Sequence, residues 1–262
     1  MKKLRFVDGG LVGDIYVNDK VEADDAAVFL YGFPAFVGPN AVTTELISGG
    51  YLACQPHYFG SYDSSGPHSP NSLVDTCRAA DEMFRRGHVS MSKDGRIRSL
   101  PSKARLWVAH SFGCLVALRA VKFLSTVETL ILLAPAVHYG QKNPDFGIRE
   151  DGLKLFDYVK VSHPYTYRLA PKDQWIDVLT GRDTLPKNGD HQSLKRVVAV
   201  VGNSDEYLDK DALGRSLQLA VGAYCGSRVR LDFHVVASDH SLHELVSAMK
   251  LEGLSHHFSC AA

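Results

Sequence analysis

The chain has 262 residues, of which 45% are hydrophobic and 22% charged, and its 29 basic residues balance its 29 acidic ones. This composition is typical of a globular protein, and the lack of a basic block in the sequence argues against a nucleic-acid partner. No apolar run in the sequence reaches the length needed to cross a bilayer, so we expect no membrane span.

The N-terminus and the cysteines bear on the compartment. Residues 1–9 carry positive charge with no apolar region behind them, which argues against a signal peptide. The cysteines are odd in number and have no C-x-x-C spacing, so we predict neither a disulfide framework nor a metal site. They are Cys54, Cys77, Cys114, Cys225 and Cys260. A cytoplasmic protein is the simplest expectation.

The first elements of the chain are short strands. Runs at 4–7 and 11–17, joined by a glycine pair, predict an antiparallel hairpin at a sheet edge. Continuously apolar runs at 26–31 and 51–55 predict strands that are buried on both faces. A helix is expected between these two runs, at 40–48.

A long helix and a hairpin are predicted next. Ser69 is the expected N-cap, Pro70 occupies the first helical position, and Gly87 ends the helix. In the segment 88–104, an Asp-Gly pair at 94–95 separates two short runs, which indicates a hairpin. Its exposed composition predicts a surface insertion.

The rest of the chain continues the alternation of strands and helices. Apolar strands are predicted at 106–109, 129–134, 197–201 and 229–237. Helices are predicted at 112–124, 209–223 and 242–250. This order predicts an α/β fold with a doubly wound, mostly parallel sheet flanked by helices.

One stretch does not follow the alternation. Residues 138–195 contain a series of aromatic residues with scattered prolines and charges, and have room for two or three short helices. We therefore expect a core formed by 1–137 and 196–262, with a small cap insertion at 138–195. The aromatic residues of the cap form a substrate pocket, pack the cap onto the core, or do both.

The strand at 106–109 leads into Ser111, and a helix rich in small residues follows. A serine at so tight a bend has a strained backbone, and the residues two positions away must be small, as Ala109 and Gly113 are. The bend exposes the hydroxyl and directs the first amides of the helix toward the atom that it attacks. This context predicts a nucleophile; the alternative is that Ser111 only caps the helix.

A serine nucleophile needs a base and an acid that orients the base, and both should follow strands at the same edge of the sheet. Asp205 follows the strand at 197–201 and is the favoured acid. Glu206, its neighbour, is the alternative acid. Asp205 could instead cap the helix that follows it.

The favoured base is His240, which lies in the loop after the strand at 229–237. His234 lies within that strand, and His243 falls inside the last helix, so both are less suited to the role. The chain order serine, aspartate, histidine is the one that nucleophile-elbow enzymes require.

Two backbone amides are predicted to form an oxyanion hole. One belongs to Phe112, directly after the nucleophile, and the other to Phe33, in the loop after the strand at 26–31. Gly32 allows this loop to approach the substrate closely, and Pro34 fixes its exit.

Together these pieces resemble the α/β-hydrolase superfamily over most of the chain, outside 138–195. The matching segments are Tyr31-Gly-Phe-Pro34, Ala109-His-Ser-Phe-Gly113, Gly202-Asn-Ser-Asp205 and Ser238-Asp-His240. The resemblance implies a Ser111–His240–Asp205 triad, an acyl-enzyme intermediate and no cofactor.

Two positions depart from the family pattern. Tyr31 stands where histidine is usual, and we expect it to change the hydrogen bonding behind the oxyanion loop. Ala109 stands where glycine is usual and is small enough to fit. The Gly-Phe-Pro run is also similar to epoxide hydrolases, but those use an aspartate nucleophile where this chain has Ser111.

The sequence thus predicts a serine hydrolase that cleaves a carboxylic ester or thioester of a small to medium substrate. A carbon–carbon bond hydrolase, an acyltransferase or a small peptidase would use the same residues. The alternative outside enzymology is a non-catalytic protein that binds a small ligand on this fold. A structural or interaction protein is a third reading, supported only by the hairpin at 88–104.

Overall fold

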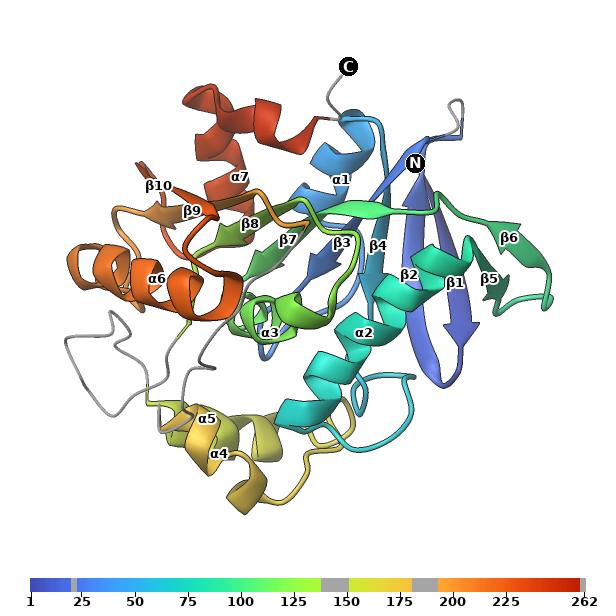
Figure 1. The fold of residues 1–262 in the computed structure, drawn as a ribbon. Coiled ribbons are helices and arrows are strands. Elements are labelled where there is room, and N and C mark those ends of the chain that lie inside the picture. Colours follow the sequence, from blue (N-terminus) through green and yellow to red (C-terminus); the bar gives the residue numbers. More distant parts are fainter. Residues whose placement is uncertain (20–22, 138–150, 181–192, 260–262) are drawn as a thin grey trace.

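The computed structural model describes residues 1–19, 23–137, 151–180 and 193–259. Its centre is a ten-stranded sheet with helices on both faces (Figure 1). The strands are β1 (Lys2–Asp8), β2 (Leu11–Val17), β3 (Asp25–Leu30), β4 (Tyr51–Pro56), β5 (His88–Met91), β6 (Ile97–Ser99), β7 (Ala104–His110), β8 (Thr129–Leu133), β9 (Arg196–Gly202) and β10 (Arg230–Val236).

The helices alternate with these strands for most of the chain. The α-helices are α1 (Ala41–Ser48), α2 (Pro70–Arg86), α3 (Gly113–Ala120), α4 (Gly152–Ser162), α5 (Ile176–Leu179), α6 (Lys210–Cys225) and α7 (Leu242–Leu251). Short 3₁₀ helices are η1 (Val121–Phe123), η3 (Lys172–Gln174) and η4 (Leu254–Phe258). In Figure 1, α1 and α7 cover one face of the sheet, and α2, α3 and α6 cover the other.

The strand order is β10-β9-β8-β7-β3-β4-β2-β1-β5-β6. From β10 to β4 all neighbouring strands are parallel, and β2, β1, β5 and β6 continue the sheet in antiparallel pairs. The predicted doubly wound, mostly parallel sheet is therefore confirmed. In such a sheet the carboxyl ends of the parallel strands meet at one edge, which is where ligands bind.

Local signals placed the helix ends well. The Ser69 side chain accepts a hydrogen bond from the backbone of Ser72, Pro70 begins α2, and Gly87 ends it in the left-handed region with φ 72°. Asp209 caps α6. The predicted helix at 112–124 is shorter than expected, because α3 ends at Ala120 and the chain tightens into η1.

The prediction that the first two strands form the edge of the sheet is wrong. β1 pairs with β5 on its outer side, with Phe6 opposite Met91, so β6 is the edge strand. The hairpin expected at 88–104 exists as β5 and β6. Its exposed composition reflects its place at the border of the sheet, where β6 has a single neighbouring strand.

The central strands are buried on both faces, as their continuous apolar sequences require. In β7 and β8, Trp107, Val108, Ile131 and Leu132 are completely buried. Each buried aliphatic side chain of this size contributes about 1.5–3 kcal/mol relative to an exposed one. The sheet therefore forms a rigid base for the loops at its carboxyl edge.

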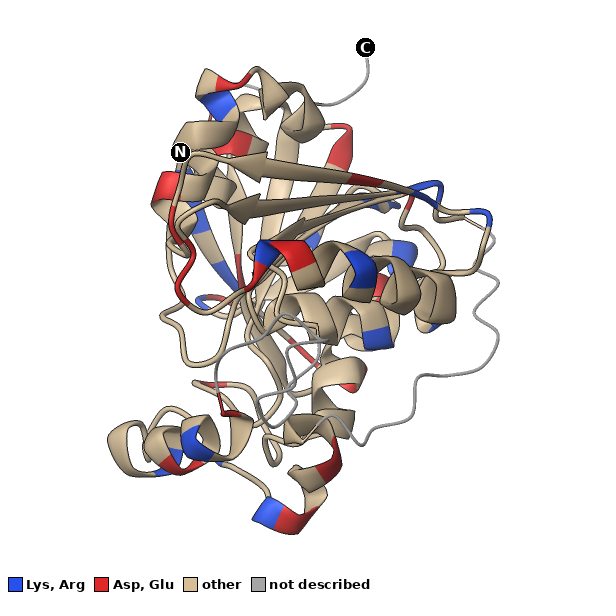
Figure 2. Cartoon of the chain, turned by 90° about the vertical axis from the view of Figure 1, so that its left-hand side faces the viewer, with Lys and Arg blue, Asp and Glu red and all other residues tan. Residues whose placement is uncertain are grey.

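Surface charges are mixed, and the described cysteines form no disulfide. On the side of the molecule shown in Figure 2, basic and acidic positions are interspersed. Cys54, Cys77, Cys114 and Cys225 are free and buried, whereas Cys260 lies outside the described residues. Among residues that the structure describes, no group of His, Cys, Asp and Glu could hold a metal ion, and no helix is long and apolar enough to span a membrane.

Candidate active site

Ser111 lies at a sharp turn between β7 and α3, with φ 52°. Its backbone N–H donates to the carbonyl of Leu133 at 2.9 Å, which ties the turn to the end of β8. A non-glycine residue in this region costs on the order of 1–3 kcal/mol. The N-cap of α3 is Phe112, without a side-chain hydrogen bond, so the alternative role of Ser111 as a helix cap is excluded.

The need for a small residue at 113 has a specific cause in the structure. A Cβ at Gly113 would lie 2.6 Å from the carbonyl oxygen of Leu30 and 2.7 Å from that of Tyr31. The first turn of α3 therefore packs directly on the end of β3. Ala109, two residues before the serine, is completely buried, and its methyl group is accommodated.

The three side chains predicted to act together are brought together. His240 Nε2 lies 3.0 Å from Ser111 Oγ, and His240 Nδ1 lies 2.7 Å from Asp205 Oδ2. Because a carboxylate only accepts, Nδ1 carries the proton and Nε2 is free to accept the serine hydroxyl proton. The His240 side chain is 20% exposed, whereas that of Asp205 is 1% exposed.

Asp205, the predicted acid, is held in place by hydrogen bonds from nearby backbone N–H groups. Asp205 Oδ1 accepts hydrogen bonds from the N–H groups of Tyr207 and Leu208, at 2.9 and 3.0 Å. It therefore orders the turn before α6, while Asp209 caps the helix itself. Glu206 is exposed. Of the two candidate acids, Asp205 is the one that contacts the histidine.

Gly202 lies where the loop that carries Asp205 meets the loop that carries His240. A Cβ at this position would lie 2.5 Å from the carbonyl oxygen of Asp239, and closer still to that of Ser238. The N–H of Ser204 also donates to the Ser238 carbonyl at 3.0 Å. The end of β9 and the loop after β10 are thus in direct backbone contact, which places His240 over Asp205.

The predicted oxyanion loop lies beside the serine. A Cβ at Gly32 would be 3.2 Å from Ser111 Cβ, so glycine allows the loop to approach. The rings of Phe33 and Phe112, the two predicted donors, have centroids 5.5 Å apart. The loop that carries Phe33 therefore lies beside the turn that carries Ser111 and Phe112.

Tyr31, which departs from the family pattern, supports this loop from behind. Its hydroxyl lies 3.0 Å from Ser61 Oγ and accepts the N–H of Tyr58 at 3.0 Å. The Tyr58 hydroxyl in turn donates to the Tyr31 carbonyl at 2.8 Å. Burial raises the pKa of Tyr31. The neutral phenol therefore bridges the loop after β3 and the loop after β4.

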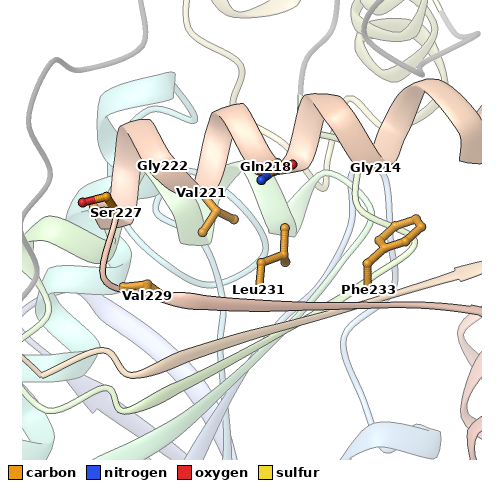
Figure 3. A pocket seen from close by; sticks show the side chains of 9 residues that line it. Gly214, Gln218, Val221, Gly222, Ser227, Val229, Leu231 and Phe233 are labelled. Carbon is orange, nitrogen blue, oxygen red and sulfur yellow. The ribbon is translucent and has the colours of Figure 1, made fainter.

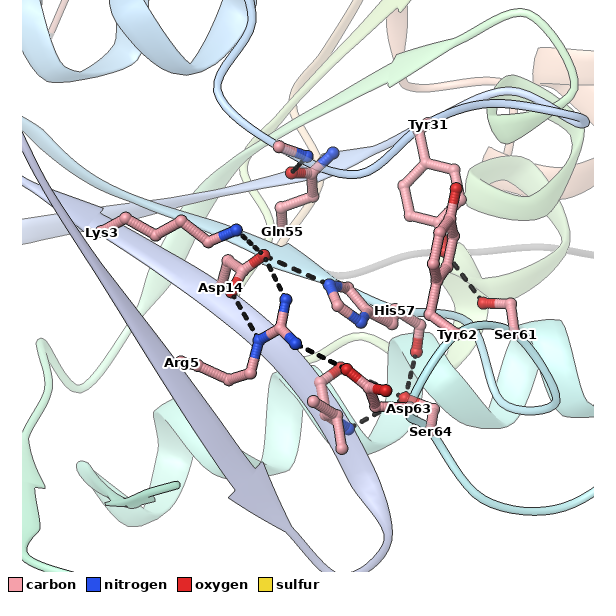
Figure 4. Close-up of polar contacts among 12 residues, drawn as sticks. Lys3, Arg5, Asp14, Tyr31, Gln55, His57, Ser61, Tyr62, Asp63 and Ser64 are labelled. Carbon is pink, nitrogen blue, oxygen red and sulfur yellow. Dashed lines mark hydrogen bonds and ion pairs between the residues drawn. The ribbon is translucent and has the colours of Figure 1, made fainter. Parts of the chain in front are cut away.

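The loop after β4 is anchored to β1 and β2 by a buried charged cluster (Figure 4). The carboxylate of Asp14 is 2.9 Å from Lys3 Nζ, 3.1 Å from Arg5 Nε and 3.3 Å from His57 Nε2. Burial alone would raise the pKa of Asp14, but the hydrogen bonds from His57, Arg5 and Lys3 hold it well below its usual range. Ser64 completes the anchor by donating to the His57 carbonyl at 2.8 Å.

Ser111 and His240 open into a cavity of about 410 Å³. Besides these two residues, it is lined by Gly32, Phe33, Pro34, Ala35, His110, Leu155, Tyr158 and Tyr207. A larger cavity of about 600 Å³ lies between α6 and β10 (Figure 3). Its lining is mainly glycine and apolar side chains, without a histidine or an acid, so the smaller cavity is the candidate active site.

The described part of the predicted cap contributes to this site. Leu155 and Tyr158 of α4 line the cavity. Trp175 is completely buried and stacks on Phe33 at 5.9 Å, with the rings 11° apart. Tyr139 and Phe146, also among the aromatic residues noted in the sequence, lie outside the described residues. Aromatic residues of 151–180 therefore both pack on the core and form a cavity wall.

Sequence reasoning did not single out His110, Tyr207 or Tyr58 as parts of the site. His110 is adjacent to the nucleophile, and that adjacency was an available signal. The Tyr207 ring packs against His240 at a centroid distance of 4.9 Å, and Tyr58 supports Tyr31. The roles of these tyrosines depend on contacts between distant loops, which no local pattern encodes.

Solved structures that are similar to this one include esterases and a putative α/β hydrolase. An esterase from Pyrococcus furiosus superposes on this structure with a TM-score of 0.61 and 14% sequence identity, and the match covers 98% of this chain and 88% of the esterase. Carboxyl esterase 2 from Tuber melanosporum has a TM-score of 0.61 and 16% sequence identity to this chain, and the match covers 98% of this chain and 85% of the esterase. A putative α/β hydrolase from Agrobacterium tumefaciens has a TM-score of 0.55 and 14% sequence identity to this chain, and the match covers 97% of this chain and 92% of that protein.

The chain therefore has the α/β-hydrolase fold, as its sequence motifs predicted. No protein-family model and no curated protein matches the sequence.

Proposed function

We propose that this protein is a serine hydrolase that cleaves a carboxylic ester or thioester of a small to medium substrate. The observation that carries the proposal is the unbroken chain of contacts from Ser111 Oγ through His240 to Asp205, at 3.0 and 2.7 Å, beside a cavity. Esterases among the structurally similar proteins support an ester as the substrate.

In the first half of the reaction, Ser111 Oγ attacks the acyl carbon while His240 Nε2 takes its proton. The tetrahedral intermediate collapses, the bond to the leaving group breaks, and His240 returns the proton to the leaving oxygen or sulfur. Asp205 stabilises the imidazolium that forms and keeps its Nδ1 proton directed inward. An acyl-enzyme ester on Ser111 remains.

Water completes the cycle. His240 removes a proton from a water molecule, which attacks the acyl carbon, and Ser111 leaves with that proton as the acid is released. The N–H groups of Phe33 and Phe112 are proposed to bind the oxyanion in both halves. Losing one such donor typically reduces turnover about 10²–10³-fold.

The lining of the cavity supports an uncharged substrate. Phe33, Leu155, Tyr158 and Tyr207 contribute apolar surface, and no lysine, arginine, aspartate or glutamate lines it among the described residues. A volume of about 410 Å³ suits a small to medium acyl or alcohol group. We further propose that 138–195 acts as the cap over a core of 1–137 and 196–262.

A fluorophosphonate probe tests the proposal directly. The wild-type protein should be labelled, and Ser111→Ala should not, with circular dichroism showing that both are folded. Ser227→Ala is the matched control, because Ser227 lines the cavity between α6 and β10 and should leave labelling unchanged. A folded wild-type protein that is not labelled and hydrolyses no p-nitrophenyl ester would instead be a binding protein.

A further inference from the structure

His110, the residue beside the proposed nucleophile, contacts the proposed general base, His240. Its Nε2 lies 3.0 Å from the carbonyl oxygen of His240, and the two rings are 5.4 Å apart. A carbonyl oxygen can only accept a hydrogen bond, so Nε2 must carry a proton. This contact joins the end of β7 to the loop between β10 and α7.

We propose that His110 is a positioning residue that holds the backbone of His240 and so sets the distance from His240 Nε2 to Ser111 Oγ. This inference rests on the proposed hydrolase function as far as it concerns catalysis. His110 and Ser111 are consecutive in the chain. A displacement of the nucleophile turn would therefore move the group that holds the base in the same direction.

Other hydrogen bonds that involve the backbone of the His240 loop lead to neighbouring elements rather than to the nucleophile turn. The Ser238 carbonyl receives the N–H of Ser204, and the Asp239 side chain receives the N–H of Ser241. These contacts tie the loop to β9 and to the start of α7, respectively. The bond from His110 connects the backbone of His240 with β7, so it restrains the loop in the direction of the serine.

The charge state of His110 suits this role. Burial is the largest cause that lowers the pKa of His110 to about 4, and the neighbouring His240 side chain lowers it further. The hydrogen bond to the His240 carbonyl and the Asp205 carboxylate act in the opposite direction but are weaker. His110 is therefore neutral at pH 7, with its single proton on Nε2. A neutral ring adds no repulsion when His240 becomes an imidazolium during the reaction.

Two substitutions separate the hydrogen bond from the packing. His110→Leu keeps an apolar side chain of similar size without a donor, and His110→Gln keeps an N–H that can reach the carbonyl. With p-nitrophenyl esters, we expect His110→Leu to lower kcat about 10–100-fold with KM within about twofold, because small misplacements of catalytic groups cost rate. His110→Gln should recover most of the loss.

The rate of fluorophosphonate labelling of Ser111 should fall by the same factor as kcat in His110→Leu. The proposal is overturned if His110→Leu keeps wild-type kcat. It is also overturned if both variants lower kcat equally, or if His110→Leu lowers the melting temperature and leaves kcat unchanged. Either result would indicate that His110 contributes only to packing.

A second measurement does not depend on turnover. In protein with ¹⁵N-labelled histidine, two-bond ¹H–¹⁵N spectra report which ring nitrogen is protonated, and the signal lost in His110→Gln identifies this ring. We expect neutral His110 with its proton on Nε2 from pH 8 to about 5. A neutral ring with its proton on Nδ1 would contradict the proposal, because Nε2 could then not donate to the His240 carbonyl. A wild-type protein that shows the expected tautomer but no labelling would instead count against the hydrolase function.

Discussion

Replacing Gly202 by alanine should displace the loop that carries His240 without altering the side chain of Ser111, His240 or Asp205. The new Cβ would lie 2.5 Å from the Asp239 carbonyl oxygen and nearer still to that of Ser238, whereas real Cβ contacts stay above 3.0 Å. Both contacts are backbone atoms that have no rotamer with which to escape. The two loops must therefore separate by at least about half an ångström.

The displaced residues immediately precede His240, which makes contacts of 3.0 Å to Ser111 and 2.7 Å to Asp205. A misplacement of about 1 Å in a catalytic group can cost about 10²-fold in rate, so we expect Gly202→Ala to lower kcat/KM about 10–100-fold. Overpacking at a backbone contact should also cost about 1–3 kcal/mol in the free energy of unfolding.

Ester hydrolysis and urea unfolding of Gly202→Ala and Gly222→Ala test this reasoning. Gly222 lies within α6 with nothing within 4 Å of an added Cβ. Alanine there should leave kcat/KM unchanged and stabilise the helix by up to about 1 kcal/mol. If Gly202→Ala keeps both wild-type turnover and wild-type stability, the close approach of the two loops does not position the histidine.

Three further outcomes are expected. Asp205→Asn should lower turnover of p-nitrophenyl esters about 10³–10⁴-fold with little loss of melting temperature; equal activity would move the acid role to Glu206. Ala109→Val should lower the free energy of unfolding by about 1–3 kcal/mol, because residue 109 is completely buried beside the turn, and an unchanged melting temperature would mean that the turn is not crowded. Burial lowers the pKa of His68 in the folded protein to about 4, whereas the pKa of this histidine in the unfolded chain is near 6.5. As pH falls, His68 is therefore protonated in the unfolded chain before it is protonated in the folded protein. Stability should therefore decline between about pH 6.5 and 4, by up to about 3 kcal/mol from this residue, and urea unfolding of His68→Gln at pH 7 and 5 should show a smaller decline than wild type.

The parts of the site that the sequence revealed are those fixed by local backbone geometry. The turn at Ser111 needs an exposed hydroxyl with small residues around it, and these requirements fall within five consecutive positions. The predicted capping of α2 by Ser69 is equally local. Such features can be recognised in a single sequence because the residues that form the turn or the helix end lie next to one another in the chain.

Strand pairing at the antiparallel side of the sheet was less predictable. Nothing in the run at 4–7 shows that its outer side pairs with residues more than eighty positions later, as Phe6 does with Met91. Pairing of this kind depends on which edge remains open once the other strands have assembled. The partners of Tyr31 and Asp14 were hidden for the same reason, since both interact with a loop that follows a different strand.

The order of the strands explains why the loop that carries His240 needs so much backbone support. Ser111 follows β7, Asp205 follows β9 and His240 follows β10, so His240 starts three strand spacings, about 14 Å, from Ser111. A histidine side chain covers less than half of that distance, and the loop after β10 must reach back across the ends of β9 and β8. The glycine at 202 removes the obstacle to that path, and the His110 bond holds its far end. The geometry of the site therefore depends as much on the residues that let the loop cross the sheet as on the three side chains that meet there.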